Sequence, residues 1–421
     1  MNKKLIAVIM SIYLLLVGCI NVSGVDIDKN DKDICYGFII SINKNQSEQN
    51  YTNYILQCNV SQLINELLHN KLDVYWICDD LTALLTKRLN ENNSIENNFE
   101  KGSYIVPFSS SDKDNLIKSI IIKYDNLFGI IYKIFESMSD VKAFKLVEPK
   151  IAYHGGYNVY WTHYDRVLKE GGFLFTSKLE WGNISKKLNN NDFNVFMWAG
   201  LKGDWKDLFA TKFHILDYLS IRRFVRNGGG YIGSCYGASE ISSGRILPIN
   251  FIKACLPQLP SWPKLAFTTY ASTRALPGGS WYGLTVKIKD SDNPIAFGLK
   301  SEISNCSYWS GPMFLGLKGK TKVVATIKGI DRAKWDFSNR MPEHPIPQSL
   351  LDLWINFSID KPIWITTEFG NGKVVAFGDH PERMFFYDVG YTEGPPPRIL
   401  FNAVRYASSI GPTSIDVNVL G

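Results

Sequence analysis

From residue 149 onward, short apolar runs alternate with segments whose apolar residues recur at helical spacing. The runs are rich in β-branched and aromatic residues, as buried strands are, and include Ile151–Gly155, Phe173–Ser177, Phe193–Gly200 and Tyr231–Ser234. A chain that alternates strands and helices builds βαβ units, in which the strands run parallel and the helices cover the sheet. The pattern therefore predicts an α/β fold for this part of the chain.

A shorter α/β pattern precedes it and begins at Cys35. Strand-like runs surround a helical segment, and a second helix is predicted over Lys113–Phe135. Pro149 marks a plausible boundary, so we expect a small α/β domain over residues 35–148 and a larger domain over 149–421. An insertion rich in Trp, Pro and charge, at about 328–361, is either a lid over a substrate or surface decoration.

The composition indicates a globular protein and argues against nucleic-acid binding. With 421 residues, 45% of them hydrophobic, and 11 tryptophans, the chain has enough apolar side chains for a large core. The net charge of +6 comes from 46 basic and 40 acidic residues scattered along the chain, without a basic stripe. We therefore expect no nucleic-acid partner.

The N-terminus has the pattern of an export signal. Lys3 and Lys4 precede an apolar run, Leu5–Val17, that is short for a membrane-spanning helix. The run ends in Leu-Val-Gly-Cys, which resembles a bacterial lipobox, and this resemblance implies cleavage before Cys19 and lipidation of its thiol. Residues 1–19 would then be a lipoprotein-type signal peptide and 20–34 a polar spacer. An ordinary signal peptide cut later and an uncleaved anchor are the alternatives.

The other cysteines are widely spaced and form no C-x-x-C pair, a pattern that indicates neither a zinc site nor a disulfide framework. We expect no metal. Cys235 differs from the other cysteines in its local sequence, because it lies in the stretch Gly-Ser-Cys-Tyr-Gly. It follows a strand-like run and precedes a short helical segment, so it would occupy a sharp strand-to-helix turn.

Such a turn can present a nucleophile. Gly233 and Gly237 would let strand and helix approach closely, as in the G-x-S-x-G nucleophile elbow. The helix N-terminus would favour the thiolate of Cys235, and the backbone N–H of Tyr236 would stabilise an oxyanion. The alternative is a small buried cysteine at the end of a core strand, because cysteine is among the most buried residue types.

A base is available downstream. Of the six histidines, His380 directly follows a β-rich run, Val374–Phe377, and would lie at a strand end. Glu382 stands two residues further on, where its carboxylate would orient the imidazole and stabilise the imidazolium. Cys235, His380 and Glu382 thus make a complete set of nucleophile, base and orienting acid.

These residues resemble those of the class I glutamine amidotransferase-like superfamily, and more closely its group related to the N-terminal domain of biotin-protein ligases. The likeness rests on three motifs in the same order, "VRNGGGYIGSCYGAS", "YWSGPMF" and "GKVVAFGDHPE". It implies a flavodoxin-like, doubly wound, mostly parallel sheet. It also implies that Cys235 is the nucleophile, His380 the general base and Glu382 the acid that orients it.

The resemblance implies further site residues as well. The second oxyanion donor would come from the loop "WAGLKGDW", which makes Gly200 and Leu201 candidates. The chain departs from the family pattern by the bulky Tyr236 and by the lack of a Gly-Gly-Pro run in that loop, and both departures put glutamine in doubt as the substrate. Substrate contacts are predicted for His154, Tyr308 and Trp309, with a purely structural role as the alternative.

The expected function is an exported, lipid-anchored, extracytoplasmic Cys-His-Glu hydrolase. It would cleave an amide or peptide bond in a small substrate through an acyl-enzyme, without a cofactor, with the membrane and an envelope protein as partners. The alternative is a non-catalytic ligand- or protein-binding module that keeps the amidotransferase-like fold.

Overall fold

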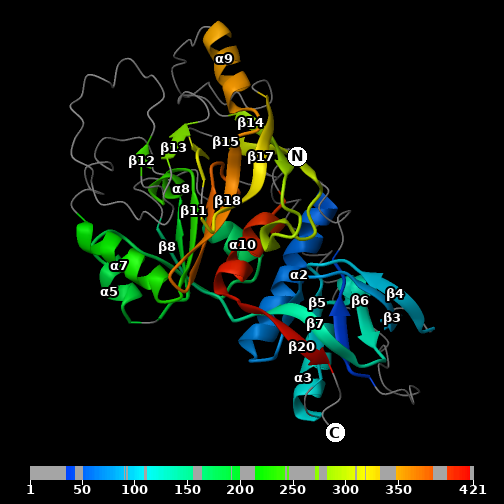
Figure 1. The fold of residues 1–421 in the computed structure, drawn as a ribbon. Coiled ribbons are helices and arrows are strands. Elements are labelled where there is room, and N and C mark those ends of the chain that lie inside the picture. The colour runs from blue at the N-terminus through cyan, green and yellow to red at the C-terminus, as the bar shows by residue number, and fades with distance from the viewer. Residues whose placement is uncertain are drawn as a thin grey trace, which may run out of the picture. The chain divides into compact units, whose positions relative to one another are not determined.

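The protein has a mixed α/β fold, and its described residues form two large sheets and one of three strands (Figure 1). This computed structural model describes residues 35–42, 51–89, 91, 93–108, 111–154, 164–190, 192–199, 214–241, 244–245, 271–274, 282–308, 311–317, 319–331, 348–382 and 396–417. The predicted signal peptide with Cys19, the spacer, Gly200, Leu201 and Trp309 lie outside these residues. Among the helices described, none is both long and apolar enough to cross a membrane.

The first sheet has eight strands in the order β20-β7-β2-β5-β1-β6-β3-β4 and is antiparallel throughout. Its strands are β1 (Gly37–Ile40), β2 (Tyr75–Ile77), β3 (Leu81–Arg88), β4 (Ile95–Phe99), β5 (Tyr104–Pro107), β6 (Ile131–Ile134), β7 (Met138–Lys145) and β20 (Ile410–Val417). Side chains alternate between its faces, as the pleat requires. Phe38 and Ile40 pack in the cluster that contains helices α2 (Tyr51–His69) and α3 (Ser111–Ile122), whereas Ile39 packs in a second cluster.

The helix predicted over Lys113–Phe135 is shorter in the structure. Helix α3 ends at Ile122, a 3₁₀ helix, η2, covers Asp125–Ile130, and β6 follows and pairs with β1. The prediction was wrong in its second half because short isoleucine-rich runs fit either a buried helix or a strand, and here pairing with β1 decides.

The second sheet has nine strands in the order β15-β14-β17-β18-β19-β11-β10-β8-β9. They are β8 (Lys150–His154), β9 (Phe175–Lys178), β10 (Val195–Trp198), β11 (Gly230–Ser234), β14 (Tyr282–Ile288), β15 (Glu302–Tyr308), β17 (Lys322–Asp331), β18 (Pro362–Phe369) and β19 (Gly372–Phe377). The five strands from β9 to β19 in this order run parallel, and the remaining pairs are antiparallel. The third sheet joins β12 (Gly244–Arg245), β13 (Ala271–Arg274) and β16 (Pro312–Phe314).

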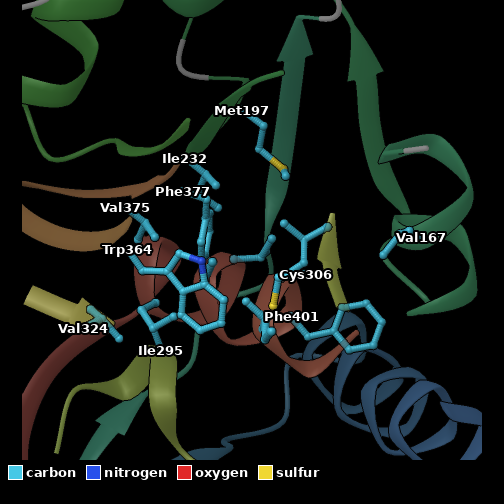
Figure 2. Close-up of a cluster of buried hydrophobic side chains, with 14 of the residues drawn as sticks. Val167, Met197, Ile232, Ile295, Cys306, Val324, Trp364, Val375, Phe377 and Phe401 are labelled. Carbon is cyan, nitrogen blue, oxygen red and sulfur yellow. The ribbon is translucent and has the colours of Figure 1, made fainter. Parts of the chain in front are cut away.

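Helices pack against both faces of the parallel strands. One cluster joins Met197, Ile232 and Phe377 to residues of α4 (Tyr164–Glu170) and α10 (Arg398–Ser408), and Figure 2 shows part of it. The neighbouring strand residues, such as Phe196 and Tyr231, belong to a second cluster with α5 (Ile184–Leu188) and α7 (Ile215–Arg226). Because apolar side chains cover both faces, these strands read as continuous hydrophobic runs.

The last strand of the chain pairs in the first sheet. Strand β20 follows α10 and pairs with β7, with Ile410 opposite Lys145 and Ile415 opposite Val141. Helix α10 also reaches the first sheet, since Arg405 donates from Nη1 to Tyr104 Oη at 2.7 Å. The residues from Cys35 onward form one compact unit. The predicted ranges 35–148 and 149–421 thus share the first sheet, a feature that a linear reading of the chain does not anticipate.

Candidate active site

Cys235 lies on the turn between β11 and α8 (Tyr236–Glu240) and has a rare backbone conformation. Its φ is 50° and its ψ is −109°, and its surface is only 6% exposed. The turn is fixed by two backbone hydrogen bonds, from the Cys235 N–H to Phe377 O at 2.9 Å and from the Ser239 N–H to Cys235 O at 3.1 Å. Positive φ in a residue other than glycine costs energy, and such strain concentrates at functional sites.

Both flanking glycines are needed for this turn. A Cβ on Gly233 would lie 2.7 Å from the carbonyl carbon of Gly237, and a Cβ on Gly237 would lie 2.1 Å from Trp198 O. No side chain fits at either position without moving backbone atoms. This is the close approach of strand and helix that the sequence indicates for a nucleophile elbow.

His380 and Glu382 form the other half of the site. They follow β19, the strand that pairs with β11, and the backbone N–H of His380 donates to Ser307 O at 2.8 Å. His380 Nδ1 and Glu382 Oε1 are 2.8 Å apart, and the two residues are 3% and 0% exposed. A buried carboxylate this close fixes both the tautomer and the orientation of the imidazole.

The Cys235 side chain also affects the pKa of the His380 imidazole. Burial alone lowers the pKa of His380, but the charge of the Cys235 sulfur, that of Glu382 and side-chain hydrogen bonds to both raise it to about 10. Since Nδ1 faces Glu382, Nε2 is the nitrogen that remains for the sulfur. The arrangement favours a proton on the imidazole at neutral pH, flanked by two acidic groups.

Two hydroxyl groups that the sequence analysis did not single out join this network. Ser234 donates from Oγ to Glu382 Oε1 at 3.2 Å, and Tyr164 Oη lies 2.9 Å from the same Ser234 Oγ. Ser234 stands beside Cys235 in the chain, but Tyr164 begins a separate helix, α4. Only the fold brings Tyr164 close to Ser234 and Glu382, so local sequence patterns do not reveal it.

Gly311, which accepts a hydrogen bond from Tyr308, packs against the same turn. Tyr308 is fully buried and donates from its hydroxyl to Gly311 O at 2.7 Å. A Cβ on Gly311 would lie 1.7 Å from Gly378 O and 3.4 Å from the Cα of Cys235. The three motifs that are far apart in the sequence therefore meet here, and the described contacts of Tyr308 are to the protein itself.

His154 ends β8 in the same row of residues as Trp198 and Gly233. It is fully buried, its Nδ1 lies 2.8 Å from Leu179 O, and its ring is 4.3 Å from that of Trp181. Burial lowers its pKa, which keeps the ring neutral. These contacts hold His154 in the core on the α7 side of the sheet.

The Tyr236 side chain also turns toward α7. Its ring centroid lies 6.0 Å from that of Trp198, and its hydroxyl hydrogen bonds with Tyr218. It packs with the cluster on this face, whereas Tyr164 belongs to the cluster on the α4 face. Gly200 and Leu201, the other predicted oxyanion donors, lie outside the described residues.

Burial disfavours the thiolate of each of the other described cysteines. Burial raises the pKa of Cys58 to about 12 and that of Cys78 to about 11, and it also raises the pKa of Cys306. None of the described cysteines is in a disulfide. Across the described part of the chain, no group of three or more His, Cys, Asp or Glu side chains is arranged to hold a metal ion.

No protein-family model and no curated protein sequence matches this chain. Similar solved structures include a protein described as ThuA-like from Bacteroides uniformis, which is 11% identical with a TM-score of 0.36, over 62% of this chain and 91% of that one. A glutamine amidotransferase from Thermotoga maritima is 10% identical with a TM-score of 0.29, over 55% of this chain and 76% of that one. Likenesses this distant assign no function to the chain.

Proposed function

We propose that the protein is a cysteine hydrolase of amide or peptide bonds, with Cys235 as nucleophile, His380 as general base and acid, and Glu382 as the group that orients His380. One observation carries the proposal. The buried His380 ring contacts Glu382 through Nδ1 at 2.8 Å, and the charge of the nearby Cys235 sulfur raises the pKa of the same ring. A nucleophile, a base and an orienting third group in contact are the signature of an activated nucleophile.

The proposed reaction has two halves. The Cys235 thiolate attacks the carbonyl carbon, the S–C bond forms, and the carbonyl electron pair moves to oxygen, which the Tyr236 N–H stabilises. The C–N bond then breaks, and the His380 imidazolium gives its proton to the departing amine. In the second half His380 removes a proton from water, the water oxygen attacks the thioester, and the C–S bond breaks. An acid is released, and the thiolate and imidazolium return.

The strand order of the second sheet supports a class I glutamine amidotransferase-like enzyme. Numbered along the chain, the parallel strands β8, β9, β10, β11 and β19 lie in the order 2-1-3-4-5, which is that of flavodoxin-like doubly wound sheets. Ligand sites in such sheets lie at the carboxyl ends of the strands. Cys235 and His380 follow the carboxyl ends of two neighbouring strands, so their position fits a class I glutamine amidotransferase-like enzyme.

The N-terminal pattern supports an extracytoplasmic, lipid-anchored location through Cys19, and with it hydrolysis. An amidotransferase passes ammonia to an ATP-dependent partner, and ATP is not supplied outside the cytoplasm. Water is then the acceptor of the acyl group. A small amide or a peptide of the cell envelope, free or part of an envelope protein, is the substrate class that this location favours.

Alkylation by iodoacetamide at neutral pH tests the central claim. Cys235, Cys58 and Cys306 are almost equally buried, at 6%, 4% and 0% exposed, so reagent access alone predicts similar rates. We expect Cys235 to react at least about tenfold faster than the other two, because the thiolate is the reactive species. Mass spectrometry of the peptides identifies the alkylated residue.

Substitution of the base completes the test. His380→Ala is expected to remove the preference for Cys235, whereas His69→Ala, at a histidine whose side chain is 47% exposed, is expected to leave it unchanged. If Cys235 in the wild type reacts no faster than Cys58 and Cys306, the hydrolase proposal is wrong. The fold would then serve the alternative role of a non-catalytic binding module.

A further inference from the structure

We propose that Tyr164 and Ser234 are positioning residues that hold Glu382, and through it His380, in the geometry that catalysis needs. This inference rests on the proposed function and extends the three-residue site to a line of five. The line runs from Tyr164 through Ser234, Glu382 and His380 to Cys235. It joins α4, β11 and the segment after β19, three elements that are distant in the sequence.

The direction of each hydrogen bond in the line follows from the number of protons. Ser234 has a single O–H, and it donates this proton to Glu382 Oε1 at 3.2 Å. The Tyr164 hydroxyl, 2.9 Å from Ser234 Oγ, must therefore be the donor in their contact. Burial and the nearby charge of Glu382 raise the pKa of Tyr164 well above its ordinary value, so this donor keeps its proton at any working pH.

Two donors thus converge on one carboxylate oxygen. Ser234 Oγ and His380 Nδ1 both contact Glu382 Oε1, at 3.2 Å and 2.8 Å. Glu382 is fully buried, so the hydrogen bonds that it accepts determine the orientation of its carboxyl group. Within the described part of the chain, loss of the Ser234 hydroxyl would leave His380 as the hydrogen-bond donor to this oxygen.

Burial and packing restrict the movement of Tyr164 and Ser234, as a positioning role requires. Tyr164 and Ser234 are 1% and 0% exposed, so neither hydroxyl can exchange its partner for bulk water. Tyr164 is packed in the cluster on the α4 face, with its ring centroid 6.4 Å from that of Tyr153. Close packing restricts the movement of buried side chains, so a Tyr164 hydroxyl held by packing at one end of the line restricts the position of the Glu382 carboxyl group at the other.

The experiment measures the iodoacetamide alkylation rate of Cys235 in the full-length protein at neutral pH. Ser234→Ala removes a hydrogen bond to a charged group and is expected to slow alkylation about tenfold or more. Tyr164→Phe removes a bond between neutral groups and is expected to slow it roughly threefold to tenfold. Tyr153→Phe is the matched control, since the Tyr153 hydroxyl interacts with Asp165 and not with the triad.

Two further readouts separate positioning from a general loss of packing. Because Tyr164 acts only through Ser234, Tyr164→Phe should add nothing in the Ser234→Ala background, whereas independent packing effects would multiply. Proton NMR follows the far-downfield signal of the His380 Nδ1–H, which a buried carboxylate partner produces. We expect it to shift upfield in Ser234→Ala and Tyr164→Phe and to stay in place in Tyr153→Phe.

The outcomes distinguish the two proposals. If Cys235 is reactive and His380→Ala abolishes this, but Tyr164→Phe and Ser234→Ala leave the rate and the His380 signal unchanged, the positioning role is refuted and the hydrolase proposal stands. If the wild-type Cys235 itself shows no enhanced reactivity, the hydrolase proposal fails first. Multiplicative effects in the double variant would also overturn the positioning role.

Discussion

Replacement of Lys373 by methionine should change how the stability of the protein depends on pH. Lys373 lies near the start of β19, where its Nζ donates to Ser409 O at 2.8 Å and to Ser409 Oγ at 2.9 Å. The ammonium group also lies 4.9 Å from the ring centroids of Phe144 and Tyr406. Burial lowers the pKa of Lys373 from 10.5 to about 8, because the charged form loses its hydration.

The direction of this pH dependence follows from the number of protons bound by the folded and the unfolded protein. Between about pH 8 and pH 10.5 the unfolded chain keeps the Lys373 proton while the folded protein releases it, so the free energy of unfolding rises with pH in this window. A shift from 10.5 to about 8 corresponds to roughly 3 kcal/mol at 1.36 kcal/mol per unit, an upper value because part of the side chain meets solvent. Lys373→Met removes this titration. Relative to the variant, the wild type should gain up to about 3 kcal/mol by pH 10.5.

Urea denaturation of both proteins from about pH 7 to pH 10.5 measures the difference. His380 acts with the opposite sign, because its raised pKa gives stability that is complete below 6.5 and lost as the pH rises through about 10. That contribution is common to both proteins and cancels in the difference. Lys289→Met, at an exposed lysine, is the control. A wild-type minus Lys373→Met difference that stays constant across the range would refute the reasoning.

Three other perturbations have defined outcomes. Gly237→Ala would place a Cβ 2.1 Å from Trp198 O, so we expect a loss of at least about 2 kcal/mol in urea denaturation and of Cys235 reactivity, and an unchanged protein would contradict the turn geometry. Burial raises the pKa of Asp379 to about 7 from 3.8, so wild-type stability should fall as the pH rises through this window. Asp379→Asn should then raise the melting temperature at pH 8 more than at pH 4, and equal shifts would count against it. Cys19→Ser should abolish metabolic labelling with a radioactive fatty acid, and persistent labelling would exclude Cys19 as the acceptor.

The sequence was most informative where covalent neighbours determine the structure. The strand-turn-helix around Cys235, with glycines two residues away on each side, has the conformation that its pattern indicates, because steric limits on a tight turn are local. The pair His380 and Glu382 is also local, since a single residue, Pro381, separates the imidazole and the carboxylate that contact each other. Such patterns can be read without knowing what packs around them.

The sequence was least informative where partners are distant or where burial decides. Phe173–Ser177 is apolar enough for a buried strand, yet β9 is an edge strand: Phe175 at its start is 42% exposed, and Leu174 just before it is 62% exposed. Likewise, Ile215, Leu219 and Ile221 all fit the apolar period of α7, but Ile215 and Leu219 are each 48% exposed, whereas Ile221 is fully buried. Hydrophobicity alone does not say which neighbour will cover a side chain.

The position of Tyr236 bears on the substrate more directly than any other departure from the family pattern. A large side chain after the nucleophile would block an amide group only if it lay on the side of His380 and Glu382. Its ring instead packs on Trp198 and bonds with Tyr218, while Ser234 and Tyr164 connect to the triad on the α4 side. The bulk of Tyr236 therefore anchors the first turn of α8, and with it the N–H proposed to stabilise the oxyanion. On this geometry Tyr236 gives no steric reason to exclude a primary amide, so a substrate screen should include simple amides as well as peptides.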